Sequence, residues 1–459
     1  MKSSKAQTHA KFHRLPILRF DEFQRLTSYA GLVVFQAFFQ RIDLKSRLRA
    51  CFAHMPVHPI FGHATVTMLL VVHLLLGFRR LRGLDYYRHD PLVARMIGLR
   101  RLPDVATVSR ALADLDAQSV ESVRVLVRTL VLDRLVRESF ARLTLDFDGS
   151  VLSTKGHAEG TAVGFNKLKK GARSYYPLFC TVAQTGQFFD RLHRAGNVHD
   201  SRGSLEFMSD CFQILRRELP PTILEARIDS AFFDEDRMEA LDKDDVEFTC
   251  SVPFERFPEL KRLIESERGW EQIDRDWAFA ESSWHPKCWS AEFRFLLLRQ
   301  RRPQQVKGAL QLDLFEPRSF EFEYKVIVTN KHGSARSVLL FHNGRGSQEK
   351  IFGEAKQHAA LDVIPTRTLC GNQLFTLAAM LTHNLTRELQ MQAAPRLHFA
   401  LPKRPAQWEF LQLGTIRQRW LHLAGRLTRP AGRLTLTITE NPVIREDLER
   451  FLEVLKPAA

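Results

Sequence analysis

The N-terminal part of the chain has the hydrophobic spacing of helices. Apolar residues recur at three- and four-residue intervals over residues 32–39, 65–78 and 120–135, with no strand-like alternation between them. The pattern therefore predicts a helical region over residues 1–140.

One more helix is expected within residues 102–115, where Asp104 suits a helix start. Thr107, Ser109 and Arg110 would share its polar face, and apolar residues would pack inward. This arrangement resembles the recognition helix of a helix-turn-helix motif. An ordinary amphipathic helix explains the pattern equally well.

The period changes after residue 141. Leu143, Leu145 and Phe147 alternate with polar residues, so they face one side of a predicted strand, and Asp146 and Asp148 face the other. Carboxylates on a buried strand are costly unless they are paired with a cation or bind a metal ion. Both aspartates are therefore candidate site residues.

A strand, two further antiparallel strands, a helix and a fourth strand are expected in that order. The later elements fall at residues 176–182, 188–193, 204–218 and 223–229, and the fourth strand ends in Asp229. A carboxylate at this end of a parallel strand lies where α/β sheets hold ligands. The alternative is that Asp229 only caps a helix.

The pattern after the fourth strand predicts an interrupted sheet. Residues 247–252 and 324–330 have the apolar character of core strands, and tryptophan-rich residues 269–323 between them predict a β-rich insertion. Residues 372–390 predict an amphipathic helix that covers the core.

Candidate site residues follow the strand predicted at residues 324–330. A glycine-rich turn is expected at residues 343–346, with Ser347 starting a helix. Glu349 would lie in the first helical turn, and Lys356 two turns later on the same face. A carboxylate on a rigid element suits a hard cation, and Arg345 and Lys356 suit phosphates.

The charge of the chain favours a polyanionic partner. The 459 residues include 67 Lys and Arg against 52 Asp and Glu, a net charge of +15. Basic residues are concentrated in residues 1–55 and 396–433, where arginines such as Arg417 and Arg419 would follow a phosphate backbone.

Other features exclude several classes of protein. The six cysteines contain no Cys-x-x-Cys pair, so neither a structural zinc site nor a disulfide framework is expected, and the thiols are expected to be reduced in the cytoplasm. No signal peptide is expected, and the most apolar run, residues 66–78, is too short to span a bilayer. No phosphate-binding glycine-rich loop of the ATPase type is present.

The spacing of Arg345, Glu349 and Lys356 resembles the Arg-Glu-Lys part of the "YREK" signature of DDE transposases of bacterial insertion sequences. Among these, the chain most resembles the group numbered thirteen-eighty. His342 stands where the signature has its tyrosine. The order of strand with Asp, antiparallel strands, helix and strand with Asp also resembles this family.

The resemblance implies an α/β fold with a ribonuclease-H-like core, a mixed sheet flanked by helices, together with a β-rich insertion and a helical N-terminal region. It implies that Asp148, Asp229 and Glu349 are catalytic and hold Mg²⁺, for which Mn²⁺ would substitute. Asp146 is the alternative to Asp148 as the first ligand. The expected DNA-binding residues are His342, Arg345, Lys356, Lys167, Lys169, Lys170 and Arg173.

The implied function is metal-dependent DNA strand cleavage and strand transfer at transposon ends, in the bacterial cytoplasm at the nucleoid. The partners would be double-stranded DNA, both terminal inverted repeats and target, and a second copy in a synaptic homodimer, with no membrane. A stand-alone nuclease of the same fold and a non-catalytic DNA-binding derivative are the alternatives. The expected regions are a helical DNA-binding region at 1–140, a first core segment at 141–268, the insertion at 269–323, a second core segment at 324–395 and a basic C-terminal region at 396–459.

Overall fold

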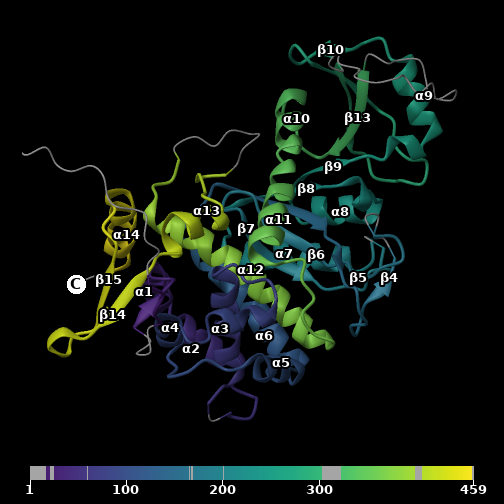
Figure 1. Cartoon of the computed structure of the whole chain (residues 1–459). Helices are drawn as coiled ribbons and strands as arrows, with labels where there is room; N and C mark the ends of the chain where they lie inside the picture. The colour runs from purple at the N-terminus through teal and green to yellow at the C-terminus, as the bar shows by residue number, and fades with distance from the viewer. Residues whose placement is uncertain are drawn as a thin grey trace, which may run out of the picture.

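A nine-stranded mixed sheet forms the centre of the protein, with helices against both faces (Figure 1). The structure is a computed structural model, and it describes residues 17–20, 25–58, 60–164, 166, 169–199, 201–301, 322–397 and 406–456. Across the sheet the strands are β10 (Glu271–Gln272), β11 (Trp277–Ser282), β12 (Arg294–Arg301), β13 (Phe322–Thr329), β9 (Glu247–Ser251), β8 (Ile223–Ile228), β2 (Arg142–Gly149), β6 (Leu178–Val182) and β7 (Gln187–Leu192).

The direction of the strands places the two candidate aspartates at one edge. β2 pairs in parallel with β8, and β8 with β9, whereas the other neighbours in this sheet are antiparallel. Leu143, Leu145 and Phe147 are fully buried on one face of β2, which confirms the predicted alternation. Asp148 near the end of β2 and Asp229 directly after β8 therefore lie at the same edge.

In its described residues the insertion extends this sheet and does not form a sheet of its own. β13 pairs with β12 along its whole length, but only its last three residues pair with β9. The register places Ile327 opposite Ser251, the last residue of β9. β13 thus joins the predicted insertion to the core by backbone hydrogen bonds.

Helices cover the two faces of the sheet. One face packs against α7 (Ser204–Glu218) and α8 (Glu235–Lys243). The other faces α11 (Gly346–Ala359) and α12 (Leu369–Ala393), and α10 (Ala335–Asn343) packs on the β12–β13 end. Figure 1 shows α10, α11 and α12 crossing in front of the sheet.

The helix α12 is buried on almost every side. The predicted helix is present, but it is a central helix and not an amphipathic cover, because the N-terminal helices enclose its outer face. These helices are α1 (Leu32–Arg41), α2 (Leu44–Cys51), α3 (His63–Leu75), α4 (Pro91–Ile97), α5 (Val105–Ala113) and α6 (Ala117–Glu138). They confirm a helical N-terminal region, and α5 begins with Asp104 as its cap.

Smaller elements complete the fold. A three-stranded sheet joins the two ends of the chain and consists of β1 (Leu26–Thr27), β14 (Gly425–Thr428) and β15 (Thr435–Ile438). A second small sheet consists of β3 (Leu152–Ser153), β5 (Arg173–Tyr175) and β4 (Ala162–Val163). The remaining helices are α9 (Pro258–Ser266), α13 (Leu413–Ile416) and α14 (Pro442–Leu455), with short helical turns at Leu81–Tyr86, Ser230–Phe232, Phe254–Arg256, Arg417–Leu421 and Pro430–Gly432.

The structure corrects two expectations from the sequence. The turn expected at residues 343–346 is present at Gly344 and Arg345, between α10 and α11, but Gly344 (φ −62°, ψ −19°) and Arg345 (φ −54°, ψ −33°) keep right-handed helical angles and not those of a glycine-specific turn. Arg417 is buried, and its Nε donates to the carbonyl of Leu75 at 2.7 Å, so it holds helices together and does not follow DNA. No helix of the described residues is long and apolar enough to cross a membrane.

The attachment of α12 to the sheet gives a stability prediction. Asn384 accepts from the backbone N–H of Phe188 at 2.8 Å and donates to its carbonyl at 2.7 Å, next to the β-bulge between β6 and β7. Asn384→Leu leaves both buried groups without partners, so we expect the free energy of unfolding to fall by about 2–4 kcal/mol in urea denaturation.

Thr376→Val is the matched control, because the buried Thr376 hydroxyl donates within its own helix, to the carbonyl of Asn372 at 3.0 Å. We expect a loss well below that of Asn384→Leu. Equal losses for the two variants would contradict the assigned role of Asn384.

Candidate active site

Asp148 and Asp229 converge on one guanidinium group. Nη1 of Arg345 lies 3.8 Å from Oδ2 of Asp148 and 3.6 Å from Oδ2 of Asp229. The two carboxylate oxygens are therefore within about 7.5 Å of each other. The side chains are 26% and 34% exposed, so a ligand from solvent can reach both.

Asp146 has a different environment from Asp148. It lies opposite Arg227 in the parallel register of β2 and β8, and both side chains are 0% exposed. Nε and Nη2 of Arg227 each donate to a different carboxylate oxygen of Asp146, both at 2.6 Å. This bidentate ion pair compensates the negative charge of the Asp146 carboxylate inside the protein.

The same two residues fix the helices that follow. Arg227 donates through Nη1 to the carbonyl of Phe341 in α10, at 3.4 Å. Gln348 in the first turn of α11 donates through Nε2 to the backbone carbonyl of Asp146, at 2.8 Å. The junction of α10 and α11 is therefore tied to the strands that carry the aspartates.

Glu349 follows Gln348 and is exposed in the first turn of α11. The described residues contain no group of three or more His, Cys, Asp or Glu side chains placed to hold one metal ion. The structure thus brings Asp148 and Asp229 together but does not bring Glu349 to them.

The first turn of α11 is held by the Gln348 bond and not by a helix cap. Among the described residues no side chain caps it, and the Ser347 hydroxyl expected to do so is buried without a hydrogen-bond partner. A Cβ atom added at Gly346 or Gly353 would meet nothing within 4 Å. Packing in the described part of the chain therefore does not require either glycine.

His342 does not lie where DNA would reach it. It is 1% exposed, with Nδ1 at 3.0 Å from the Thr249 hydroxyl and Nε2 at 2.9 Å from the Ser251 hydroxyl. Burial, and then the nearby cations, hold the pKa of His342 well below its usual value, so the ring is neutral at pH 7. The DNA contact expected of His342 is therefore replaced by a link from α10 to β9.

Two lysines lie in the electric field of the aspartates. Lys356 is partly buried on α11, and burial lowers its pKa, which Asp362 and Asp148 oppose. Lys325 on β13 donates to Oδ1 of Asn343 at 3.1 Å. Burial and the charge of Arg345 lower the pKa of Lys325 to about 8, against the attraction of Asp229.

The remaining predicted DNA-binding residues belong to the segment that forms the small sheet β3–β5–β4, far in the sequence from Arg345 and Lys356. Lys169 and Lys170 are exposed between β4 and β5. Arg173 on β5 donates through Nε to the Thr161 hydroxyl at 3.1 Å, so it also holds the preceding segment. Lys167 lies outside the described residues.

Arg227, Gln348 and Lys325 are not among the residues predicted from the sequence. Arg227 is a charged residue within the apolar strand predicted at 223–229, and this could have indicated it, because a buried Asp146 needs a cationic partner. No local pattern marks Lys325, since its position depends on pairing between distant strands.

The carboxylates of Asp148 and Asp229 supply part of a divalent-cation site. Two carboxylates from neighbouring strand ends already surround one positive group, the Arg345 guanidinium, which occupies the kind of position that a metal ion would take. Carboxylate oxygens suit Mg²⁺ and Mn²⁺. A third carboxylate would have to come from the first turn of α11.

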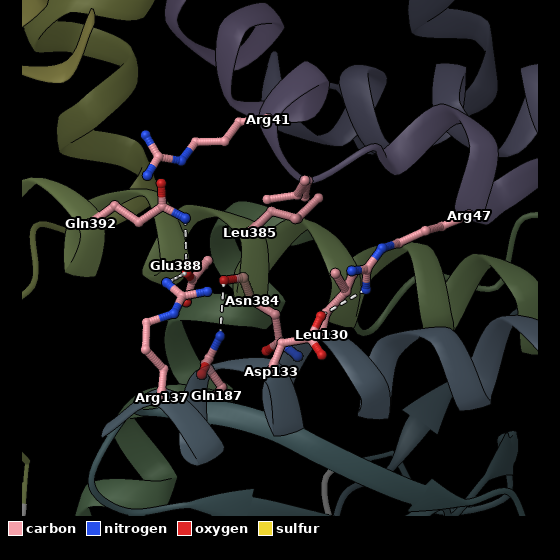
Figure 2. Close-up of a pocket in the computed structure, with 11 residues that line it drawn as sticks. Arg41, Arg47, Leu130, Asp133, Arg137, Gln187, Asn384, Leu385, Glu388 and Gln392 are labelled. Atoms are coloured by element: carbon pink, nitrogen blue, oxygen red, sulfur yellow. Dashed lines mark hydrogen bonds and ion pairs between the residues drawn. The ribbon is translucent and has the colours of Figure 1, made fainter. Parts of the chain in front are cut away.

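A separate pocket of about 300 Å³ lies between α2, α6 and α12 (Figure 2). Four of its charged residues form ion pairs with one another, Arg47 with Asp133 at 2.8 Å and Arg137 with Glu388 at 3.7 Å. None of the predicted catalytic or DNA-binding residues lines it. We therefore place the candidate active site at the sheet edge that carries Asp148 and Asp229.

Comparison with known families identifies the class of protein. Residues 18–459 match the family described as Transposase DDE domain group 1. Because the match covers nearly the whole chain, the chain belongs to this family of DDE transposases. None of the curated proteins compared matches the chain.

Three solved structures with similarity to the chain contain transposases. The piggyBac transposase in a synaptic complex with hairpin DNA has a TM-score of 0.43 and 11% identity, over 78% of this chain and 74% of that one. A pre-cleavage Mos1 transpososome has a TM-score of 0.17 and 14% identity, over 37% and 57%. A Mos1 paired-end complex has a TM-score of 0.17 and 13% identity, over 37% and 56%. Family membership rests on the sequence match.

The buried pair gives a prediction about stability. Arg227→Met leaves the Asp146 carboxylate buried without its cation, so we expect the free energy of unfolding to fall by about 3–5 kcal/mol in urea denaturation. The double variant Asp146→Leu/Arg227→Met removes both charges, and we expect it to be more stable than Arg227→Met alone. A double variant less stable than the single one would contradict this.

Proposed function

We propose that the protein is an insertion-sequence transposase that cleaves DNA at transposon ends and joins the ends to target DNA. The observation that carries the proposal is the convergence of Asp148 and Asp229, from neighbouring parallel strands, on a single cationic group at a partly exposed edge. Asp148 and not Asp146 is the proposed first ligand, because Asp146 is enclosed with Arg227.

The topology supports a ribonuclease-H-like core. Strands β7, β6 and β2 are antiparallel neighbours, and β8 and β9 continue from β2 in parallel, with α7 between β7 and β8 in the sequence. This order places the ends of the first and fourth core strands side by side. Glu349 is proposed to join the site from the first turn of α11, which packs on one face of this sheet.

The proposed chemistry is displacement at a phosphodiester. When bound, a pair of Mg²⁺ or Mn²⁺ ions held by Asp148, Asp229 and Glu349 would activate the attacking hydroxyl and stabilise the leaving oxygen. The side chains of Arg345 and Lys356 would bind the DNA phosphates around the scissile bond. The protein thus supplies position and charge, with no covalent nucleophile.

The proposed partners are the terminal inverted repeats, the target DNA and a second copy of the chain. The net charge of +15 supports a DNA partner, and Lys169 and Lys170 on the exposed β4–β5 segment are proposed to contact its backbone. A homodimer follows from the need to bring two transposon ends together.

Cleavage of a plasmid carrying the gene with its flanking DNA tests the function. We expect excision to require Mg²⁺ or Mn²⁺, and Asp148→Asn, Asp229→Asn and Glu349→Gln each to lower the rate by at least about 1000-fold, because each removes a charged ligand. Glu446→Gln, at an exposed carboxylate on α14, is the matched control and should cleave normally.

The outcomes separate the candidate functions. Cleavage without joining of the ends would indicate a stand-alone nuclease. DNA binding without cleavage, unchanged by Asp148→Asn, would indicate a non-catalytic DNA-binding protein.

Arg345 gives a prediction about metal binding that does not depend on activity. Its guanidinium lies between the two proposed ligands, so it competes with a metal ion by occupancy and by repulsion. In the absence of DNA, Arg345→Gln should bind Mn²⁺ about three- to tenfold more tightly than wild type, measured by electron paramagnetic resonance titration.

Cleavage by Arg345→Gln should nevertheless fall, since the proposed phosphate contact is lost. Arg426→Gln, at an exposed arginine on β14, is the control and should leave Mn²⁺ affinity unchanged. Equal or weaker Mn²⁺ binding by Arg345→Gln would show that the guanidinium does not occupy the metal position.

A further inference from the structure

The insertion strand β13 reaches the same sheet edge as the aspartates. Because β13 is antiparallel to β9 and Ile327 pairs with Ser251, the last residue of β9, Lys325 lies two residues beyond the end of β9. β2, β8 and β9 are parallel, so their carboxyl ends lie at this edge. The topology therefore places a lysine of the insertion beside the candidate active site.

The side chain of Lys325 points to the face that carries the helix junction. It lies on the same face of β13 as Ile327, which packs against α10. Its Nζ donates to Oδ1 of Asn343, the last residue of α10 and two residues before Arg345. An ammonium group has three N–H donors, so this bond leaves others for a ligand.

The charge of Lys325 is only partly compensated. The group is partly buried, and the described residues form no ion pair with it, whereas Arg345 repels it. Burial and this repulsion lower the Lys325 pKa, while Asp229 raises it. A partly buried ammonium beside a guanidinium is costly in the free protein, and a bound anion would offset that cost.

We propose that Lys325 is a phosphate-binding residue of the active site, contacting the backbone of the DNA strand that binds at Asp148 and Asp229. The inference rests on the proposed function and assigns to the insertion strand a direct role in holding the substrate. Arg345, Lys356 and Lys325 then surround the two carboxylates from α11 and β13, and together they would hold a polyanion that two carboxylates alone would repel.

The salt dependence of DNA binding tests the proposal. A fluorescent duplex from the DNA flanking the gene is titrated with protein at several salt concentrations, with Ca²⁺ in place of Mg²⁺. Removing one phosphate contact should lower the slope of log affinity against log salt by about 0.9. We expect Lys325→Met to show this change and about five- to tenfold weaker binding at moderate salt, and Lys325→Arg to retain the wild-type slope.

Two further variants separate charge from structure. Lys287→Met, at an exposed lysine of the insertion that pairs with Glu259, should leave the slope unchanged. Asn343→Ala removes the hydrogen bond but keeps the Lys325 charge, so it should also keep the slope. If Asn343→Ala reproduces the effect of Lys325→Met, or if Lys325→Met keeps the wild-type slope, Lys325 only supports the α10–α11 junction and the proposal is overturned.

Failure of the proposed function has a different signature. If wild-type protein binds and cleaves the flanking DNA but Lys325→Met has an unchanged slope, only the role of Lys325 is lost. If wild-type protein neither binds nor cleaves it, both the proposed function and the role of Lys325 are wrong.

Discussion

The buried ion pair between Asp146 and Arg227 is the interaction on which the site depends. It joins β2 to β8 in register, and it reaches the helices through the bonds from Arg227 to the Phe341 carbonyl and from Gln348 to the Asp146 carbonyl. A buried ion pair adds little net stability compared with apolar packing, but it tolerates few alternative arrangements. Here it fixes the strands that carry two carboxylates relative to the helix that carries Arg345.

The same constraint acts on the two-residue turn at Gly344 and Arg345. Both residues keep right-handed helical angles, and Arg345 faces the ends of β2 and β8. The far end of α11 is held by a second buried pair, between Glu354 and Arg387 of α12. The helix is thus fixed to the strands at its start and to the central helix further along.

The sequence was sufficient for elements whose pattern is local. The alternation at Leu143, Leu145 and Phe147 predicted β2, and the helix predicted at 204–218 has the bounds of α7. The glycine content around residue 344 indicates the turn between α10 and α11, but not that its backbone keeps right-handed helical angles. The burial of His342 depends on Thr249 and Ser251, and the place of Lys325 depends on β9, both far away in the sequence. Such non-local contacts leave no periodic signal.

The uncapped first turn of α11 has an energetic consequence. A glycine in a helix interior costs about 0.5–1 kcal/mol of helix stability relative to alanine, and a missing N-cap costs about 1 kcal/mol. The buried bond from Gln348 to the Asp146 carbonyl opposes opening of residues 346–349, as the Glu354–Arg387 pair does further along the helix. Glu349 is exposed directly after Gln348, so its side chain can change rotamer while this turn and the strands beneath it stay in place.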